Sequence, residues 1–175
     1  MPLTREEAGE LIKKLNDLNK SAGDFKITIA GSYRRESQVI RDIDILLVSK
    51  KLRWTDPKPI DKLKLPGEIV EANKGNIHRL TTIKFDLFGR PKRIKCDIYA
   101  VDRADLPFAL LHSTGSRELN LGLRQIAINK GWLLNQYGLW YRDRPDVKVA
   151  GTENIKTEKE IFQKLGKPYK EPKDR

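Results

Sequence analysis

The stretch FKITIAGSYRRESQVIRDIDILLVS, residues Phe25–Ser49, carries the strongest structural signal in the sequence. It contains two apolar runs, Ile27–Ala30 and Ile45–Val48, which are rich in β-branched and aliphatic residues and too short for helices. Both runs therefore predict buried strands that are neighbours in one sheet. The first run ends at Gly31–Ser32, where a turn would let backbone N–H groups approach a phosphate.

Two aspartates, Asp42 and Asp44, immediately precede the second apolar run. Residues two apart on a strand point to the same face, so these carboxylates would lie side by side while Ile43 points into the core. Adjacent carboxylates on a rigid strand are costly unless a hard cation neutralises them, and the pair therefore predicts a Mg²⁺ site. Arg35 supplies positive charge for a phosphate close to Gly31–Ser32.

An isolated Asp-x-Asp pair is common on strands that bind no metal, so its surroundings decide its meaning. Here it belongs to a longer pattern: a strand, Gly-Ser, a gap of about ten residues, Asp-Ile-Asp and a second strand. This pattern resembles the signature of the nucleotidyltransferase superfamily. Within that superfamily, the segments GSYRR and DID resemble those of family X DNA polymerases, the group that includes DNA polymerase beta. The resemblance covers residues 5–175 and is weak only within residues 50–75.

The resemblance implies an α+β fold of two parts. Residues 1–104 would form a nucleotidyltransferase palm, a mixed or antiparallel sheet with flanking helices, and residues 105–175 a small α+β subdomain that binds the nucleotide. The chain begins where the palm begins, so a minimal form without the amino-terminal lyase and helix-hairpin-helix domains is expected. Residues 50–75, rich in proline and lysine, are expected to form an excursion with one short strand at Glu68–Val70.

Local patterns predict further elements without reference to any family. Two capping boxes, each a threonine followed three residues later by a glutamate, predict helices that begin after Thr4 and Thr157. Alternating apolar residues predict a hairpin of strands 80–88 and 93–101. A short helix is expected at Leu106–Leu111.

Asp97 lies inside the second strand of that hairpin, between Cys96 and Ile98. Period-two alternation alone would allow it to be an ordinary solvent-facing residue, and Asp86 is an alternative for a third acidic residue near the aspartate pair. The resemblance favours Asp97, which matches the third catalytic, metal-binding aspartate of the family. In the family a basic residue stands two positions before this aspartate, and the resemblance matches Lys95 to it. We assign Lys95 to DNA binding.

The resemblance further implies two groups of nucleotide-binding residues. Gly31, Ser32 and Arg35 would bind the triphosphate, with Arg35 at its outer phosphates. The second group surrounds a Thr-Gly turn and the following helix, which covers the nascent base pair in the family. The expected nucleotide-binding residues of this group are His112, Ser113, Thr114, Gly115, Arg117 and Asn120. Arg124, on the same helix, would contact the template strand.

Several of these positions leave alternatives open. Asn120 and Arg124 would usually be only solvated on a helix, and the resemblance alone gives them a role. Ser113 stands where the family commonly has an aromatic residue packed against the nucleotide sugar, so discrimination against ribonucleotides is an open question. Arg41 stands where the family usually has glycine, and both Arg34 and Arg41 are as consistent with solvated side chains as with anion contacts.

The chain of 175 residues carries 35 Lys and Arg against 24 Asp and Glu, a formal net charge of +11. This excess predicts a polyanionic partner, and since no basic amphipathic helix stands out we expect nucleic acid and no membrane. No apolar run approaches the roughly 20 residues that span a bilayer. Cys96 is the only cysteine, and with His78 and His112 it gives too few soft ligands for a structural zinc. We expect an intracellular monomer.

Together these features predict a template-directed DNA polymerase that adds dNTPs to a primer 3′-OH by two-metal phosphoryl transfer, in short-gap filling during DNA repair such as base excision repair. Its cofactor would be two Mg²⁺ ions, with Mn²⁺ as a substitute, held by Asp42, Asp44 and Asp97. Its partners would be dNTP and DNA, as primer–template or gapped duplex. Two alternatives remain: a template-independent nucleotidyltransferase, acting as a terminal transferase or on RNA, and a catalytically inactive nucleic-acid-binding module.

Overall fold

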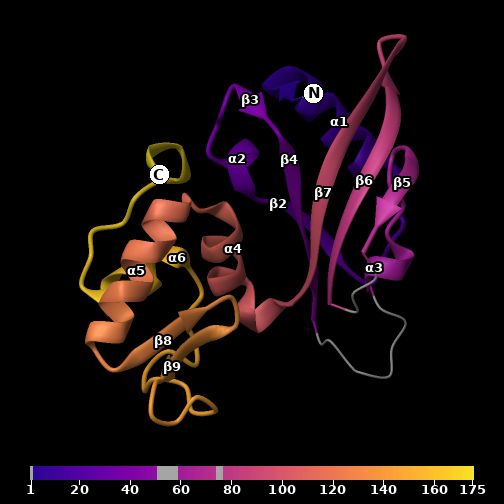
Figure 1. The fold of residues 1–175 in the computed structure, drawn as a ribbon. Coiled ribbons are helices and arrows are strands. Elements are labelled where there is room, and N and C mark those ends of the chain that lie inside the picture. Colours follow the sequence, from indigo (N-terminus) through magenta and orange to yellow (C-terminus); the bar gives the residue numbers. More distant parts are fainter. Residues whose placement is uncertain (1, 51–58, 74–76) are drawn as a thin grey trace.

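The computed structural model describes residues 2–50, 59–73 and 77–175. Figure 1 shows two lobes, one built on a large sheet and the other made of helices with a small hairpin. The first lobe contains β1 (Leu3–Thr4), α1 (Arg5–Leu18), β2 (Lys26–Ile29), α2 (Gly31–Arg34), β3 (Val39–Ile40), β4 (Asp42–Ser49), α3 (Pro59–Lys62), β5 (Glu68–Ala72), β6 (His78–Leu87) and β7 (Arg90–Asp102). The chain continues through η1 (Arg103–Asp105), α4 (Leu106–Thr114), α5 (Arg117–Asn129), β8 (Trp132–Asn135), β9 (Gly138–Tyr141), α6 (Glu158–Leu165) and η2 (Pro172–Asp174).

The main sheet has five strands in the order β2-β4-β7-β6-β5. β4 runs parallel to β7, and the other neighbouring pairs are antiparallel. The sheet is therefore mixed, as the resemblance implied. The two apolar runs predicted as neighbouring strands correspond to β2 and β4, which pair over four residues from Lys26 to Ile29, so that prediction is confirmed.

Alternation along β4 sends its side chains to two faces of the sheet. One set is buried in the main core together with α1: Ile43, Ile45 and Leu47. The opposite face carries Leu46 and Val48, which pack with Ala109 of α4. Asp42 and Asp44 share the parity of this second set, so they lie on the face that is turned toward the second lobe.

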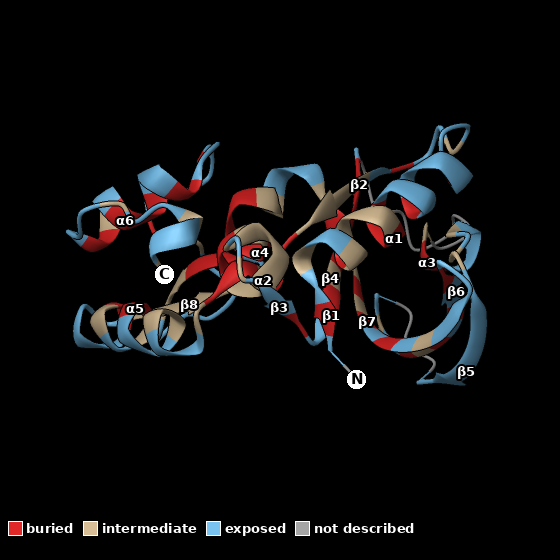
Figure 2. Ribbon diagram, turned by 90° about the horizontal axis from the view of Figure 1, so that it is seen from above, coloured by how far each residue is buried: buried red, intermediate tan, exposed pale blue. Residues whose placement is uncertain are grey.

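The second lobe has a hydrophobic core of its own. Buried side chains from α4, α5, β9 and α6 meet there, among them Leu111, Leu123, Leu139 and Phe162. In the view from above, α4 lies between the two lobes and is largely buried, whereas much of α5 is exposed (Figure 2). Among the described helices, none combines the length and apolar character needed to cross a membrane.

The capping predictions are confirmed at both helices. The Thr4 hydroxyl accepts from the Glu7 N–H at 3.2 Å, and the Glu7 carboxylate accepts in return from the Thr4 N–H at 2.9 Å. Thr157 and Glu160 form the same reciprocal pair at α6. Because the orphan N–H groups at a helix start need such partners, a four-residue pattern is enough to locate both starts.

The hairpin of β6 and β7 differs from its prediction. Its loop is the dipeptide Phe88–Gly89, not residues 89–92, and β6 already begins at His78. Both loop residues have positive φ, 54° and 74°, as a two-residue hairpin turn requires. Phenylalanine is an unusual residue at such a position, so no turn motif in the sequence pointed to the shorter loop.

Two other boundaries also differ. The helix expected at residues 106–111 continues to Thr114, which is fully buried, and stops at Gly115 with φ 72°. The short strand expected at 68–70 is part of β5, at the edge of the main sheet. Residues 51–58 and 74–75 of the expected excursion lie outside the described residues.

Candidate active site

The three carboxylates singled out in the sequence come from two adjacent parallel strands. In the register of β4 and β7, Asp44 is opposite Asp97 and Asp42 is opposite Lys95. Asp42 is exposed, whereas Asp44 and Asp97 are partly buried. The structure therefore places all three on one face of the sheet, beside the second lobe. Lys95 is an exposed neighbour on the same face.

Gly31 lies directly against Asp44. It begins α2 with a φ of +60°, and a Cβ placed on it would lie 1.7 Å from Asp44 Oδ2. Only glycine satisfies both the backbone conformation and this close approach. The expected Gly-Ser turn is therefore the start of a four-residue helix. The Ala30 N–H donates to the Asp44 carbonyl at 2.9 Å and holds that start against β4.

Polar groups suited to a phosphate surround this contact. The Ser32 hydroxyl oxygen is buried and has no hydrogen-bond partner among the residues that the structure describes, although a buried polar group usually has one. The guanidinium of Arg35 is close enough for its charge to act on Asp44, and it also donates to the Thr114 carbonyl. A hydroxyl that lacks a partner and a nearby cation fit an anionic ligand at this point.

Asp44 is the carboxylate whose protonation the site perturbs most. Burial, then the negative charges of Asp42 and Asp97, raise the pKa of Asp44 to about 7, against an opposing effect of Arg35. Burial and the two neighbouring negative charges disfavour the ionised form of Asp44, whereas Arg35 favours it. The effect of Asp42 and Asp97 on this pKa also means that the three carboxylates are electrostatic neighbours.

This donor set fits a hard divalent cation. It consists of carboxylate oxygens, which Mg²⁺ prefers, and a cation would remove the repulsion that raises the Asp44 pKa. In the described part of the chain, no three His, Cys, Asp or Glu side chains are already gathered closely enough to form a metal cluster. The three carboxylates are thus neighbours on one face of the sheet, but their oxygen atoms are not close enough together to surround one cation.

The pKa of Asp44 predicts how stability depends on pH when no divalent cation is present. The folded-state pKa lies above the unfolded value, so the folded state holds the proton between about pH 4 and pH 7. Stability from this group is complete below pH 4 and is lost as the pH rises to 7. Asp44→Asn should therefore gain stability relative to the wild type by up to about 4 kcal/mol at pH 8, and much less at pH 4. Urea unfolding of both proteins in EDTA measures this difference, and an equal difference at both pH values would contradict the prediction.

The second group of predicted residues lies where α4 meets α5. Asn120 Nδ2 donates to the His112 carbonyl at 2.8 Å, and Arg124 Nη2 lies 2.8 Å from His112 Nδ1. An arginine can only donate, so Nδ1 accepts and the imidazole carries its proton on Nε2. Burial, and then the charge of Arg124, lower the pKa of His112. The structure therefore brings His112, Asn120 and Arg124 into one hydrogen-bonded group.

The remaining predicted residues lie between these two groups. Thr114 is buried, and a Cβ on Gly115 would lie 3.3 Å from an Arg35 guanidinium nitrogen. Arg117, the first residue of α5, is exposed. Ser113 lines a cavity between the lobes. Thr114 and Gly115 thus lie against Arg35 of the phosphate-side group.

Arg34 has a role that neither alternative in the sequence anticipated. Its guanidinium donates to both oxygens of Glu158, at 3.1 and 2.6 Å, and to the Thr114 hydroxyl at 2.7 Å. Arg175 donates to the same Glu158 carboxylate at 2.7 Å. Arg34 is therefore neither solvated nor free for an anion, because it joins the two lobes through an ion pair. Arg41, by contrast, is exposed.

Comparisons with known proteins agree with this geometry. A DNA polymerase beta palm model matches residues 2–81, and a DNA polymerase beta thumb model matches residues 109–175. Repair DNA polymerase X of African swine fever virus (isolate Warthog/Namibia) is 30% identical over 175 residues, which cover 99% of this chain and 90% of the relative. The chain belongs to the family X DNA polymerases. The family and enzyme class inferred from the sequence are confirmed.

This chain covers different shares of its other relatives. DNA polymerase lambda of Rattus norvegicus is 28% identical over 188 residues, which cover 99% of this chain but 33% of that protein. A crystal structure described as Leishmania infantum polymerase beta in a ternary P/T complex aligns with a TM-score of 0.76 at 24% identity, covering all of this chain and 77% of that one. The structural likeness confirms the α+β fold.

One residue beside the carboxylates of this family X polymerase was missed in the sequence. His78, on β6, lies across from Tyr99 of β7, and its Nε2 is 2.5 Å from Asp97 Oδ1. The sequence offered His78 only as a candidate soft ligand for zinc. Its place beside Asp97 depends on the register of the hairpin, for which no local signal exists.

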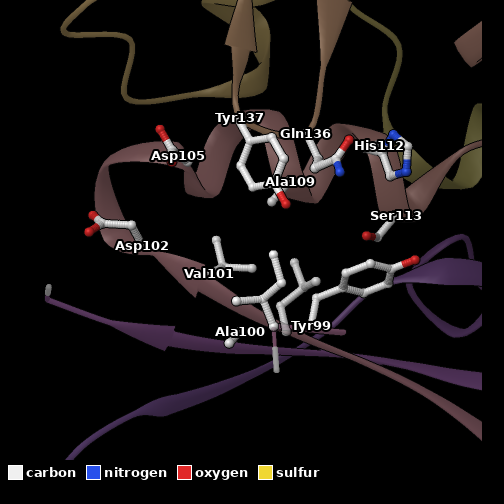
Figure 3. A pocket seen from close by; sticks show the side chains of 12 residues that line it. Tyr99, Ala100, Val101, Asp102, Asp105, Ala109, His112, Ser113, Gln136 and Tyr137 are labelled. Atoms are coloured by element: carbon white, nitrogen blue, oxygen red, sulfur yellow. The ribbon is translucent and has the colours of Figure 1, made fainter. Parts of the chain in front are cut away.

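A small cavity of about 50 Å³ lies between the lobes of the family X polymerase (Figure 3). Tyr99, Ala100 and Val101 of β7 line one side, and Ser113 and His112 of α4 line another. The turn between β8 and β9 adds Gln136 and Tyr137. The cavity adjoins the carboxylate face through Tyr99, whose hydroxyl is 3.4 Å from Asp97 Oδ2.

Proposed function

We propose that this protein is a template-directed DNA polymerase that adds dNTPs to a primer 3′-OH and fills short gaps during DNA repair. The observation that carries the proposal is the placement of Asp42, Asp44 and Asp97 on one face of adjacent strands, with Gly31 held against Asp44. Membership in the family X DNA polymerases supports the reaction, and the names of the viral relatives, repair DNA polymerases, support the role.

In this proposal Asp42, Asp44 and Asp97 hold two Mg²⁺ ions, for which Mn²⁺ can substitute. Bound Mg²⁺ would lower the pKa of the primer 3′-OH and offset charge on the triphosphate. Asp97 orients that hydroxyl and accepts its proton. The Gly31 backbone, the Ser32 hydroxyl and Arg35 bind phosphate oxygens, and their positions next to Asp44 support this assignment.

The second lobe would hold the base and the sugar. We assign the nucleotide contacts of this lobe to His112, Ser113, Thr114, Gly115, Arg117 and Asn120. Arg124 and Lys95 would contact DNA. Support comes from the hydrogen-bonded group of His112, Asn120 and Arg124, which orders three of these side chains together.

The proposed boundary between the palm, residues 1–104, and the nucleotide-binding subdomain, residues 105–175, falls in η1. The separate cores of the two lobes support it. We propose that the protein acts as a monomer on primer–template or gapped DNA. A net charge of +11 supports DNA as the partner and predicts binding that weakens steeply with salt.

Extension of a labelled primer on a one-nucleotide-gapped duplex tests this function. With Mg²⁺ and single dNTPs, we expect the templated nucleotide to dominate and Asp97→Ala to lose incorporation. The same primer without template is the control. Equal addition of all four nucleotides without template would instead indicate a terminal transferase, and the absence of any extension by the wild type would indicate a binding module.

A further inference from the structure

His78, Asp97 and Tyr99 form a compact cluster on the edge of the carboxylate face. His78 Nε2 is 2.5 Å from Asp97 Oδ1, while the Tyr99 hydroxyl donates to Asp97 Oδ2 at 3.4 Å. Each carboxylate oxygen of Asp97 therefore has its own partner. Such a pair of contacts restricts rotation of the carboxylate about its own axis.

The imidazole of His78 is itself held in place. It stacks on the Tyr99 ring with 4.3 Å between ring centroids and 9° between the planes. The two residues are directly opposite in the antiparallel ladder of β6 and β7, where facing aromatic side chains interact favourably. Tyr99 thus orients His78, and both strands fix the position from which His78 reaches Asp97.

We propose that His78 is a positioning residue that holds the Asp97 carboxylate in the orientation needed to take a divalent cation and the primer 3′-OH. An ionised carboxylate accepts only, so His78 donates through Nε2–H and occupies one lone pair of Oδ1. The remaining lone pairs stay available for a cation or a hydroxyl. Ligating carboxylates depend on such outer hydrogen bonds for their orientation. The proposal rests on the proposed function, because it concerns the carboxylate assigned to that reaction.

Lys95 does not provide this contact. It is the basic residue that the sequence placed two positions before Asp97, but it lies opposite Asp42 and is exposed. Among the described residues, the hydrogen-bond partners of the Asp97 side chain are His78 and Tyr99. Lys95, although it is the basic residue nearest to Asp97 along the chain, therefore does not orient the Asp97 carboxylate. His78, from the neighbouring strand β6, makes that contact instead.

Three substitutions separate the hydrogen bond from the stacking. His78→Phe keeps a ring against Tyr99 but has no donor, whereas His78→Gln places an amide N–H near the position of Nε2. Lys84→Phe adds a phenylalanine at an exposed site on the same face of β6, where the residue lies opposite Arg93 and not beside Asp97. We expect His78→Phe to lower kcat by about 10–100-fold with an unchanged KM for dNTP. The kcat of His78→Gln should be close to that of the wild type, and the kcat of Lys84→Phe should equal it.

A second measurement does not depend on turnover. Electron paramagnetic resonance of Mn²⁺, titrated into the protein with gapped DNA ending in a dideoxynucleotide and the templated dNTP, reports cation binding directly. His78→Phe should weaken Mn²⁺ binding by about 10-fold or more, and its melting temperature should stay near that of the wild type because 47% of the His78 side chain is exposed.

The outcomes distinguish this proposal from the proposed function. If the wild type extends primers and His78→Phe has the same kcat and Mn²⁺ affinity, the positioning role is wrong while the polymerase function stands. A variant His78→Gln as impaired as His78→Phe would also overturn the positioning role. If the wild type extends no primer, the proposed function fails, and a wild-type Mn²⁺ affinity in His78→Phe would then overturn the positioning role independently.

Discussion

Asp44→Asn is expected to lower nucleotide incorporation by more than about 10³-fold while leaving the protein folded. A bound metal at a phosphoryl-transfer site stabilises the transition state by several kcal/mol, and each 1.4 kcal/mol corresponds to a factor of about ten in rate. Asp44 is the best placed of the three carboxylates to affect that binding, because the charges of both Asp42 and Asp97 act on it and its carboxylate lies against Gly31. Single-turnover primer extension in Mg²⁺ measures the loss.

The matched control for this variant is Asp86→Asn. Asp86 was the alternative third carboxylate in the sequence, and in the structure its Oδ1 accepts from the Gly89 N–H at 2.9 Å in the hairpin loop. Its loss should leave incorporation within about threefold of the wild type, since surface changes away from a site usually cost little. Incorporation by Asp44→Asn near the wild-type rate would show that the carboxylate face is not the reaction centre.

The shared face of Asp42 and Asp44 could be predicted because it depends on local periodicity, whereas Asp97 was assigned to it only by the family resemblance. The alternation of Asp42, Ile43 and Asp44 sets which side chains share a face, and the structure follows it, with Ile43 buried in the main core. The same holds for the capped helix starts, where a threonine and a glutamate three residues apart satisfy orphan N–H groups. These features need only a few neighbouring residues, so the sequence is sufficient to find them.

His78 could not be found in this way because its role depends on strand register. With a loop at residues 89–92, Lys84 would face Asp97 across the hairpin. With the actual loop at Phe88–Gly89, Leu80 does so and His78 faces Tyr99. A shift of four residues in the register of β6 against β7 thus changes every cross-strand neighbour of Asp97. Register is set by the loop geometry, and a Phe-Gly dipeptide is not a recognised turn signal.

The contact between the lobes was missed for a related reason. Arg34 and Glu158 are 124 residues apart in sequence, and no local pattern connects them. Beside a phosphate-binding turn, Arg34 is naturally interpreted as an anion contact or a solvated side chain. The role of Arg34 is set by its partner Glu158, a buried acidic residue far away in the sequence. The burial of Glu158 could not be predicted, because it directly follows the helix cap Thr157, a position where glutamate is usually exposed.

Glu158→Ala is the substitution expected to reduce stability most. The Glu158 side chain is 5% exposed and accepts hydrogen bonds from Arg34 and Arg175, whose side chain is fully buried. Removing the carboxylate leaves two guanidinium groups without their shared partner, and loss of one member of a buried ion pair typically costs about 3–5 kcal/mol. We expect a decrease of that size in the free energy of unfolding, measured by urea denaturation at neutral pH.

A double-mutant cycle with Arg34→Ala tests whether the cost arises from the ion pair between the lobes. Residues in direct contact show coupling energies of about 0.5–3 kcal/mol, so the double variant should be less destabilised than the sum of the single variants. Lys159→Ala, at the exposed neighbouring position on α6, should change stability by less than about 0.5 kcal/mol. Strictly additive effects of the two substitutions would mean that Arg34 and Glu158 stabilise their lobes separately, and the ion pair would then not hold the nucleotide-binding lobe against the carboxylate face.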